Sequence, residues 1–89
     1  MNFQYRPQVL NQLLSHGICP TAQTEPEFVH DFVNDLYRYE LRRLRDRQMR
    51  GEIHKNVYAN YVVELRKKYI LMSVPIRFWT LSDDESDNF

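Results

Sequence analysis

The sequence is poor in the residues that interrupt helices or cross-link chains. Its 89 residues include two Gly, four Pro and one Cys. So little Gly and Pro argues against a loop-rich or low-complexity chain. A single Cys excludes an internal disulfide framework and a zinc site built from several cysteines. At 89 residues the chain is long enough for one modest core, and so short a chain leaves much surface for a partner to cover.

Long hydrophobic runs are also missing. The longest, from Tyr69 to Met72, is far shorter than the roughly 20 residues that a membrane span needs. The first seven residues lack the apolar stretch and cleavage site of a secretory signal. We therefore expect a cytoplasmic protein with no membrane partner and with Cys19 in its reduced form.

The chain has no net charge, yet its charges are unevenly distributed. Twelve Lys and Arg balance twelve Asp and Glu, and the isoelectric point is about 6.8. Residues 1–37 sum to −3, residues 38–77 to +7 and residues 78–89 to −4. Segregation of this kind bears on binding partners and not on fold.

Apolar residues recur with helical spacing in three segments. The first predicted helix, residues 7–16, has Pro in its first turn and ends at Gly17. The second, residues 25–50, ends at Gly51. The third spans residues 56–71. Thr24 and Glu27 have the spacing of a capping box for the long helix. The apolar face of the first helix holds Val9, Leu10, Leu13 and Leu14.

The two longer helices each have one predicted core face. In the long helix it consists of Val29, Phe32, Val33, Leu36, Tyr37 and Leu44. In the third helix it consists of Tyr58, Tyr61, Val62, Leu65, Tyr69 and Met72, with Asn60, Glu64, Lys67 and Lys68 assigned to the opposite side. The connector of about five residues predicts that the two helices are antiparallel neighbours.

The C-terminal part is predicted to be non-helical because Pro75 prevents continuation of the third helix. We expect residues 73–81 to form an extended segment anchored by Phe78 or Trp79. Residues 82–89 have the composition of a disordered acidic tail.

The predicted fold class is therefore all-α. Residues 1–81 would form a single helical domain, a small three-helix domain built on a long antiparallel helical hairpin. An extended C-terminal segment and the disordered acidic tail complete the chain.

Six Arg and no Lys lie between positions 38 and 50. They form two rows with i, i+4, i+7 spacing: Arg38, Arg42 and Arg45, and Arg43, Arg47 and Arg50. Like charges at this spacing repel by a few tenths of a kcal/mol per pair, roughly. Planar guanidinium groups bind carboxylates and phosphates in bidentate geometry. Three interpretations stay open: a solvated helix face, a surface for an acidic protein or the chain's own tail, and a site for nucleic-acid phosphate.

Tyr39 lies off the core face of the long helix. Tyr and Arg are frequent at interface hot spots, so we include it in the predicted binding surface. That surface consists of Arg38, Tyr39, Arg42, Arg43, Arg45, Arg47 and Arg50.

Glu40 falls where the helical pattern predicts an apolar residue, with Arg43 and Arg47 on neighbouring turns. A buried charge requires a partner. Glu40 is therefore solvated because the helix has left the core, or it forms a structural ion pair with Arg43, Arg47 or a base on the third helix, or it belongs to a functional polar site.

No motif indicates catalysis or a bound cofactor. His16 and Cys19 are close in sequence but do not supply the four ligands of a zinc site. We predict no enzyme activity, no metal, no cofactor and no small-molecule substrate. The predicted function is a non-catalytic protein-interaction module that binds an acidic protein partner or self-associates. The alternative is a nucleic-acid-binding or DNA-associated regulator, although a basic footprint would normally raise the isoelectric point.

Overall fold

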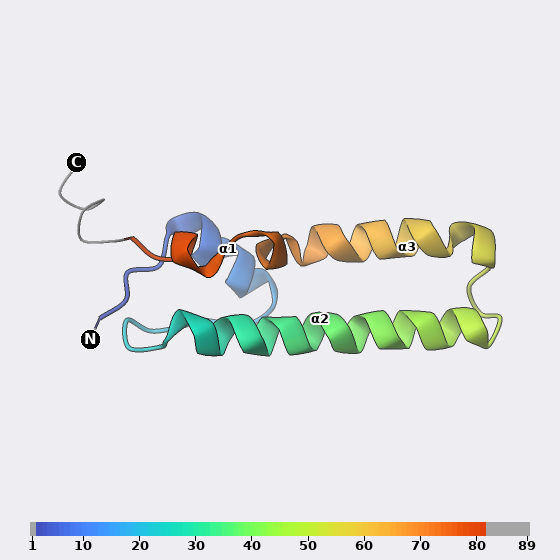
Figure 1. The fold of residues 1–89 in the computed structure, drawn as a ribbon, viewed down its shortest axis with the longest axis horizontal. Coiled ribbons are helices and arrows are strands. Elements are labelled where there is room, and N and C mark those ends of the chain that lie inside the picture. Colours follow the sequence, from blue (N-terminus) through green and yellow to red (C-terminus); the bar gives the residue numbers. More distant parts are fainter. Residues whose placement is uncertain (1, 82–89) are drawn as a thin grey trace. The chain divides into compact units, whose positions relative to one another are not determined.

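The computed structural model describes residues 2–81. This range contains the helices α1 (Pro7–Ser15), α2 (Pro26–Met49) and α3 (Lys55–Lys68), followed by two short 3₁₀ helices, η1 (Ile70–Ser73) and η2 (Ile76–Phe78) (Figure 1). β pairing within it is limited to one isolated bridge. The all-α class is thereby confirmed for the described part of the chain. The predicted acidic tail, residues 82–89, lies outside it.

The chain divides into two compact units. The terminal unit combines Met1–Asp31 with Leu71–Phe89, and the central unit is Phe32–Ile70. The first boundary falls inside α2, which therefore contributes its first six residues to the terminal unit. The single domain over residues 1–81 stays a prediction, and each unit is described by itself.

In the terminal unit, α1 is short because its two ends are fixed by Pro7 and Gly17. Pro7 has no N–H to leave unpaired in the first turn. Gly17 has a φ of +77°, and the amides of Gly17 and Ile18 donate to the Leu14 and Leu13 carbonyls, both at 2.9 Å. This is a Schellman ending, as the sequence predicts. Only half of the predicted apolar face is covered: Val9 and Leu13 are buried, and Leu10 and Leu14 are exposed.

Two segments far apart in the sequence close the terminal unit (blue and red in Figure 1). The Arg6 amide donates to the Trp79 carbonyl at 2.9 Å, and the Leu81 amide donates to the Gln4 carbonyl at 2.8 Å. Tyr5 and Thr80 form an antiparallel bridge between these two bonds. The C-terminal segment thus has a backbone partner that the sequence did not reveal.

The extended conformation predicted for residues 73–81 is wrong over most of that range. Local hydrogen bonds fold it into η1 and η2, because the Val74 amide donates to the Leu71 carbonyl and the Phe78 amide donates to the Pro75 carbonyl. Pro75 separates the two turns, since it has no N–H to continue the first.

Trp79 is the anchor of this segment, as predicted. Its side chain is fully buried, its indole N–H donates to the Val74 carbonyl at 3.0 Å, and its ring lies 5.5 Å from that of His30. Phe78, the alternative anchor, is exposed. Nearby, the buried Tyr5 donates its hydroxyl proton to the Thr24 carbonyl, and burial raises its pKa above the ordinary value.

Helix α2 has nearly the predicted length but begins one residue later, at Pro26. Glu25, and not Thr24, therefore directly precedes the helix, so the predicted capping box is out of position, and the Thr24 hydroxyl accepts from the Thr21 amide at 3.0 Å. The predicted core face is also incomplete: Val29 and Val33 are buried, whereas Phe32 is exposed.

In the central unit, α3 ends at Lys68, three residues earlier than predicted. His54 caps its start, with Nδ1 accepting from the Asn56 amide at 3.1 Å. No residue of α3 is buried, so its predicted core face is covered only in part. The buried apolar side chains of this unit are Val33, Leu44, Ile53 and Tyr69.

Among the described helices of the whole chain, none combines the length and apolar composition that crossing a membrane would need.

Candidate protein-binding groove

An open groove of about 410 Å³ lies in the central unit, between residues of α2 and α3. Helix α2 contributes Glu40, Arg43, Leu44 and Arg47, and α3 contributes Tyr61, Glu64, Leu65 and Lys68. Both sets follow the i, i+3, i+4, i+7 spacing of a single helix face. The groove is therefore lined by one continuous face of α2 and one continuous face of α3.

Apolar side chains form part of the groove. Leu44 is 8% exposed, Leu65 is partly buried and Tyr61 is exposed. Bases and acids surround them: Arg43, Arg47 and Lys68 against Glu40 and Glu64. Such a combination of an apolar patch with charged side chains of both signs can hold a peptide side chain and the charged groups next to it.

Glu40 faces α3. Its Oε1 lies 3.1 Å from the Lys68 Nζ, and its side chain is only 32% exposed. Lys68 is a base on the third helix, one of the three partners that the sequence suggested for Glu40. The structure also brings Glu40 to Tyr69, whose pKa is raised by burial and by the hydrogen bond to the Glu40 carboxylate.

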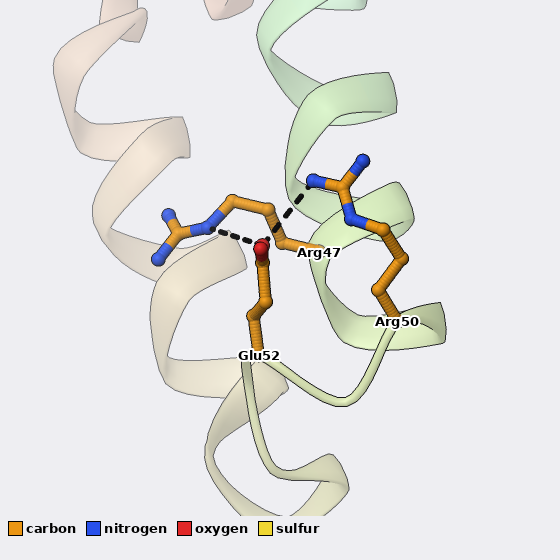
Figure 2. Close-up of polar contacts among 3 residues, drawn as sticks. All are labelled: Arg47, Arg50 and Glu52. Atoms are coloured by element: carbon orange, nitrogen blue, oxygen red, sulfur yellow. Dashed lines mark hydrogen bonds and ion pairs between the residues drawn. The ribbon is translucent and has the colours of Figure 1, made fainter.

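The connector after α2 supplies a carboxylate that neutralises two arginines. Glu52 Oε2 lies 3.6 Å from Arg47 Nε and 3.2 Å from Arg50 Nη2, as Figure 2 shows. Gly51, with a φ of +82°, turns the chain so that Glu52 can reach back to the helix. All three side chains are at least 45% exposed, and exposed pairs of this kind contribute about 0–1 kcal/mol each.

The remaining arginines of the predicted surface are not neutralised within residues 2–81. Arg38, Arg42, Arg43 and Arg45 are exposed and form no ion pair there. Arg43 lies over the ring of Tyr39, 5.9 Å from its centroid, and Tyr39 is 53% exposed as expected. Such a stacking contact leaves the guanidinium donors of Arg43 available to a ligand.

The sequence prediction missed the contribution of α3. It assigned Glu64 and Lys68 to the side opposite Tyr61 and Leu65, and this assignment is wrong. All four share one face, because positions i, i+3, i+4 and i+7 lie within a narrow sector of a helix. The spacing was visible in the sequence, but the pattern of a single helix does not show which of its faces meets another.

Within residues 2–81, no three His, Cys, Asp or Glu side chains are grouped closely enough to hold a metal ion.

Comparisons with protein-family models, with curated proteins and with solved structures find no match to this chain.

Proposed function

We propose that the protein is a non-catalytic interaction module whose central unit binds an acidic segment of a partner protein. The site is the groove between α2 and α3 together with the neighbouring arginines of residues 38–50. The antiparallel helical hairpin predicted for residues 25–71 would be its scaffold. Two contacts support this scaffold: Glu40 with Lys68 joins α2 to α3, and Arg47 with Glu52 holds the connector against the end of α2.

One observation carries the proposal: Arg43 lines a groove with an apolar patch and is not neutralised within the described residues. Its guanidinium can form paired hydrogen bonds with a carboxylate. An apolar residue beside that carboxylate would cover Leu44 and Leu65, which gains free energy as it leaves water. A ligand with both features therefore satisfies both parts of the groove.

The same groove favours protein over nucleic acid. Glu40 and Glu64 line it, and their carboxylates repel phosphates at the distance where Arg43 would bind them. A protein segment can present both carboxylates and donors, so it fits a site of mixed charge. The row Arg38, Arg42 and Arg45 lies outside the groove lining and is the part of the surface that a nucleic acid would use.

An NMR titration tests the proposal and its alternative together. The isotope-labelled protein is mixed with a synthetic peptide in which four Asp or Glu flank one Phe, and separately with single- and double-stranded oligonucleotides. We expect the peptide to shift the amide signals of residues 40–47 and 61–68, and its amide counterpart with Asn and Gln to have no effect. Oligonucleotide binding without peptide binding would overturn the proposal, and it would show a steep dependence on salt.

A cytoplasmic location and the lack of catalytic activity belong to the same proposal. The first is supported by the lone, exposed Cys19, which has no cysteine partner in the chain.

A further inference from the structure

We infer that the acidic segment recognised by the groove belongs to a second copy of this chain. The segment is the start of α2, residues 25–31, in the terminal unit. Two copies would then bind head to tail, with residues 25–31 of one copy in the groove of the next. This inference rests on the proposed function, because it uses the same groove and names its occupant.

The exposed residues at the start of α2 have the chemistry that the groove requires. Phe28 is 70% exposed, an unusual position for a large apolar side chain. Glu27 and Asp31 are also exposed, and Asp31 is one turn from both Glu27 and Phe28, because i, i+3 and i, i+4 positions are neighbours on a helix. An aromatic ring beside a pair of carboxylates matches an apolar patch beside Arg43 and Arg47.

Arg77 lines a hollow of the terminal unit together with Glu25 and Glu27, but it forms no ion pair with either carboxylate among residues 2–81. Between Arg6 and Arg38 the sequence has no Lys or Arg, and the one ion pair described for Glu27 or Asp31 is the 3.8 Å contact of Asp31 with His30. Asp31 is 83% exposed even so. The carboxylates therefore remain free to meet guanidinium groups from outside.

The charges of the two units are equal and opposite. By sequence, the terminal unit has two bases and seven acids, a net charge of −5, and the central unit has ten bases and five acids, a net charge of +5. A protein with no net charge lacks the long-range repulsion that keeps copies of a charged chain apart. Opposite charges on two units instead steer one copy toward the other in a fixed polarity.

The proposed contact is heterologous, because each copy gives its segment to one neighbour and receives the segment of another. A heterologous contact repeats from copy to copy, so it produces rings or open chains and not a symmetric dimer. Since the contact depends on exposed charges, we expect assembly at about 50 mM salt and its loss near 300 mM, where the screening length is shorter.

Sedimentation velocity with two charge-reversed variants tests this inference. R43E/R47E removes the basic groove, and E27K/D31K removes the acidic segment. Each variant alone should sediment as a monomer at low salt, and the wild type should show sizes that increase with concentration. A mixture of the two variants should associate again, since the intact acidic segment of one meets the intact groove of the other and the two reversed surfaces are also complementary. A mixture of the neutral variants R43Q/R47Q and E27Q/D31N should stop at a 1:1 complex, since only one productive contact survives between them. R66E, which reverses an exposed Arg of the same unit that does not line the groove, should assemble like the wild type.

Three results would overturn the inference. The first is a wild type that stays monomeric at low salt up to high protein concentration. The second is a mixture of the two charge-reversed variants that stays monomeric, with circular dichroism showing both folded. The milder pair R43Q/R47Q and E27Q/D31N repeats the test if a reversed variant does not fold. The third is assembly that persists in F28A or E27K/D31K but disappears when residues 82–89 are deleted. In that case residues 82–89, and not residues 25–31, would be the acidic segment that binds the groove. A monomeric wild type that still binds the acidic peptide would leave the proposed function standing.

Discussion

The terminal and central units are held together in different ways. In the terminal unit, backbone hydrogen bonds join residues 4–6 to residues 79–81, and Trp79 is completely buried beside them. In the central unit, α3 has no buried residue, and side chains such as Glu40 and Lys68 meet as ion pairs. One unit therefore depends mainly on covered apolar area, and the other leaves much of its side-chain surface accessible.

This difference indicates a division of roles. Burial gives free energy in proportion to the apolar area removed from water, so the unit with Trp79 and Leu13 fully covered is the better source of stability. The proposed binding requires uncovered groups, and Arg43 together with the exposed Tyr61 would supply them in the central unit. Four substitutions test this difference between the units.

The largest effect is expected from Trp79→Ala. Removing a fully buried Trp typically costs about 3–5 kcal/mol, and the Val74 carbonyl also loses its indole donor. We expect a loss of this size in the free energy of unfolding, measured by urea titration with circular dichroism. The neighbouring Phe78→Ala, at an exposed position, should cost less than about 1 kcal/mol. If the two variants lose equal stability, the terminal unit does not depend on its Trp.

Leu44→Ala should have the next largest effect. Leu44 is almost buried but lines the open groove, so its loss should cost about 2 kcal/mol, near the lower limit for a Leu in a core. The variant should also bind the acidic peptide more weakly, because it lacks part of the apolar patch. Val63→Ala, at an exposed position of α3, is the matched control for stability. A loss as large as that of Trp79→Ala would mean that the two units are packed alike.

Tyr69→Phe should change the pH dependence of stability. The pKa of Tyr69 is raised above its ordinary value of 10.0 by burial and by the Glu40 carboxylate, so the folded state keeps the proton that the unfolded chain releases. Wild-type stability should therefore fall as the pH rises above 10, by about 1.4 kcal/mol per pH unit for this one group. Below pH 10, Tyr69 is protonated in both the folded and the unfolded state, so it does not change the free energy of unfolding with pH.

Urea titrations between pH 9 and 11.5 measure this slope. Tyr69→Phe should have a smaller slope than the wild type, since it has no proton to lose at that position. Tyr5→Phe is the counterpart in the terminal unit, where burial also raises the pKa of the replaced Tyr. Equal slopes for the wild type and Tyr69→Phe would contradict the raised pKa of Tyr69, which is due first to burial and then to the contact with Glu40.

The smallest effect on stability is expected from Glu52→Gln. Its two ion pairs are exposed, so their loss should change the free energy of unfolding by less than about 1 kcal/mol. Affinity for the acidic peptide should increase two- to threefold, roughly, because Arg47 and Arg50 lose a competing carboxylate. Asp46→Asn is the matched control, since Asp46 forms no ion pair among residues 2–81 and the change in net charge is the same. Equal gains in both variants would show that net charge alone sets the affinity.

Local features of the structure were accessible from the sequence. Both ends of α1 and the C-terminal end of α2 follow from Pro and Gly, whose backbone constraints act within a few residues. The exposure of Tyr39 was also predicted correctly, and Trp79 was one of the two residues predicted as the anchor. These features depend on helical periodicity or on the composition of one short segment.

Features that join distant segments were not accessible in the same way. Residues 4–6 show no strand pattern, so nothing in the sequence paired them with residues 79–81. The face of α3 that lines the groove was misassigned for a related reason, because its spacing does not identify the neighbouring helix. Long-range pairing depends on the packing of the whole unit. The periodic pattern of a single segment does not show which distant segment it will contact.

Acidic protein segments are the proposed ligands of the arginines that line the groove. Isothermal titration calorimetry with the acidic, Phe-containing peptide at low salt tests this proposal directly, with the wild type, R43Q/R47Q and R66Q compared at one protein concentration. R43Q/R47Q should bind at least about tenfold more weakly, equivalent to about 1.4 kcal/mol, and R66Q should bind like the wild type. Equal affinity in all three proteins, or an equal loss in both variants, would contradict the proposal.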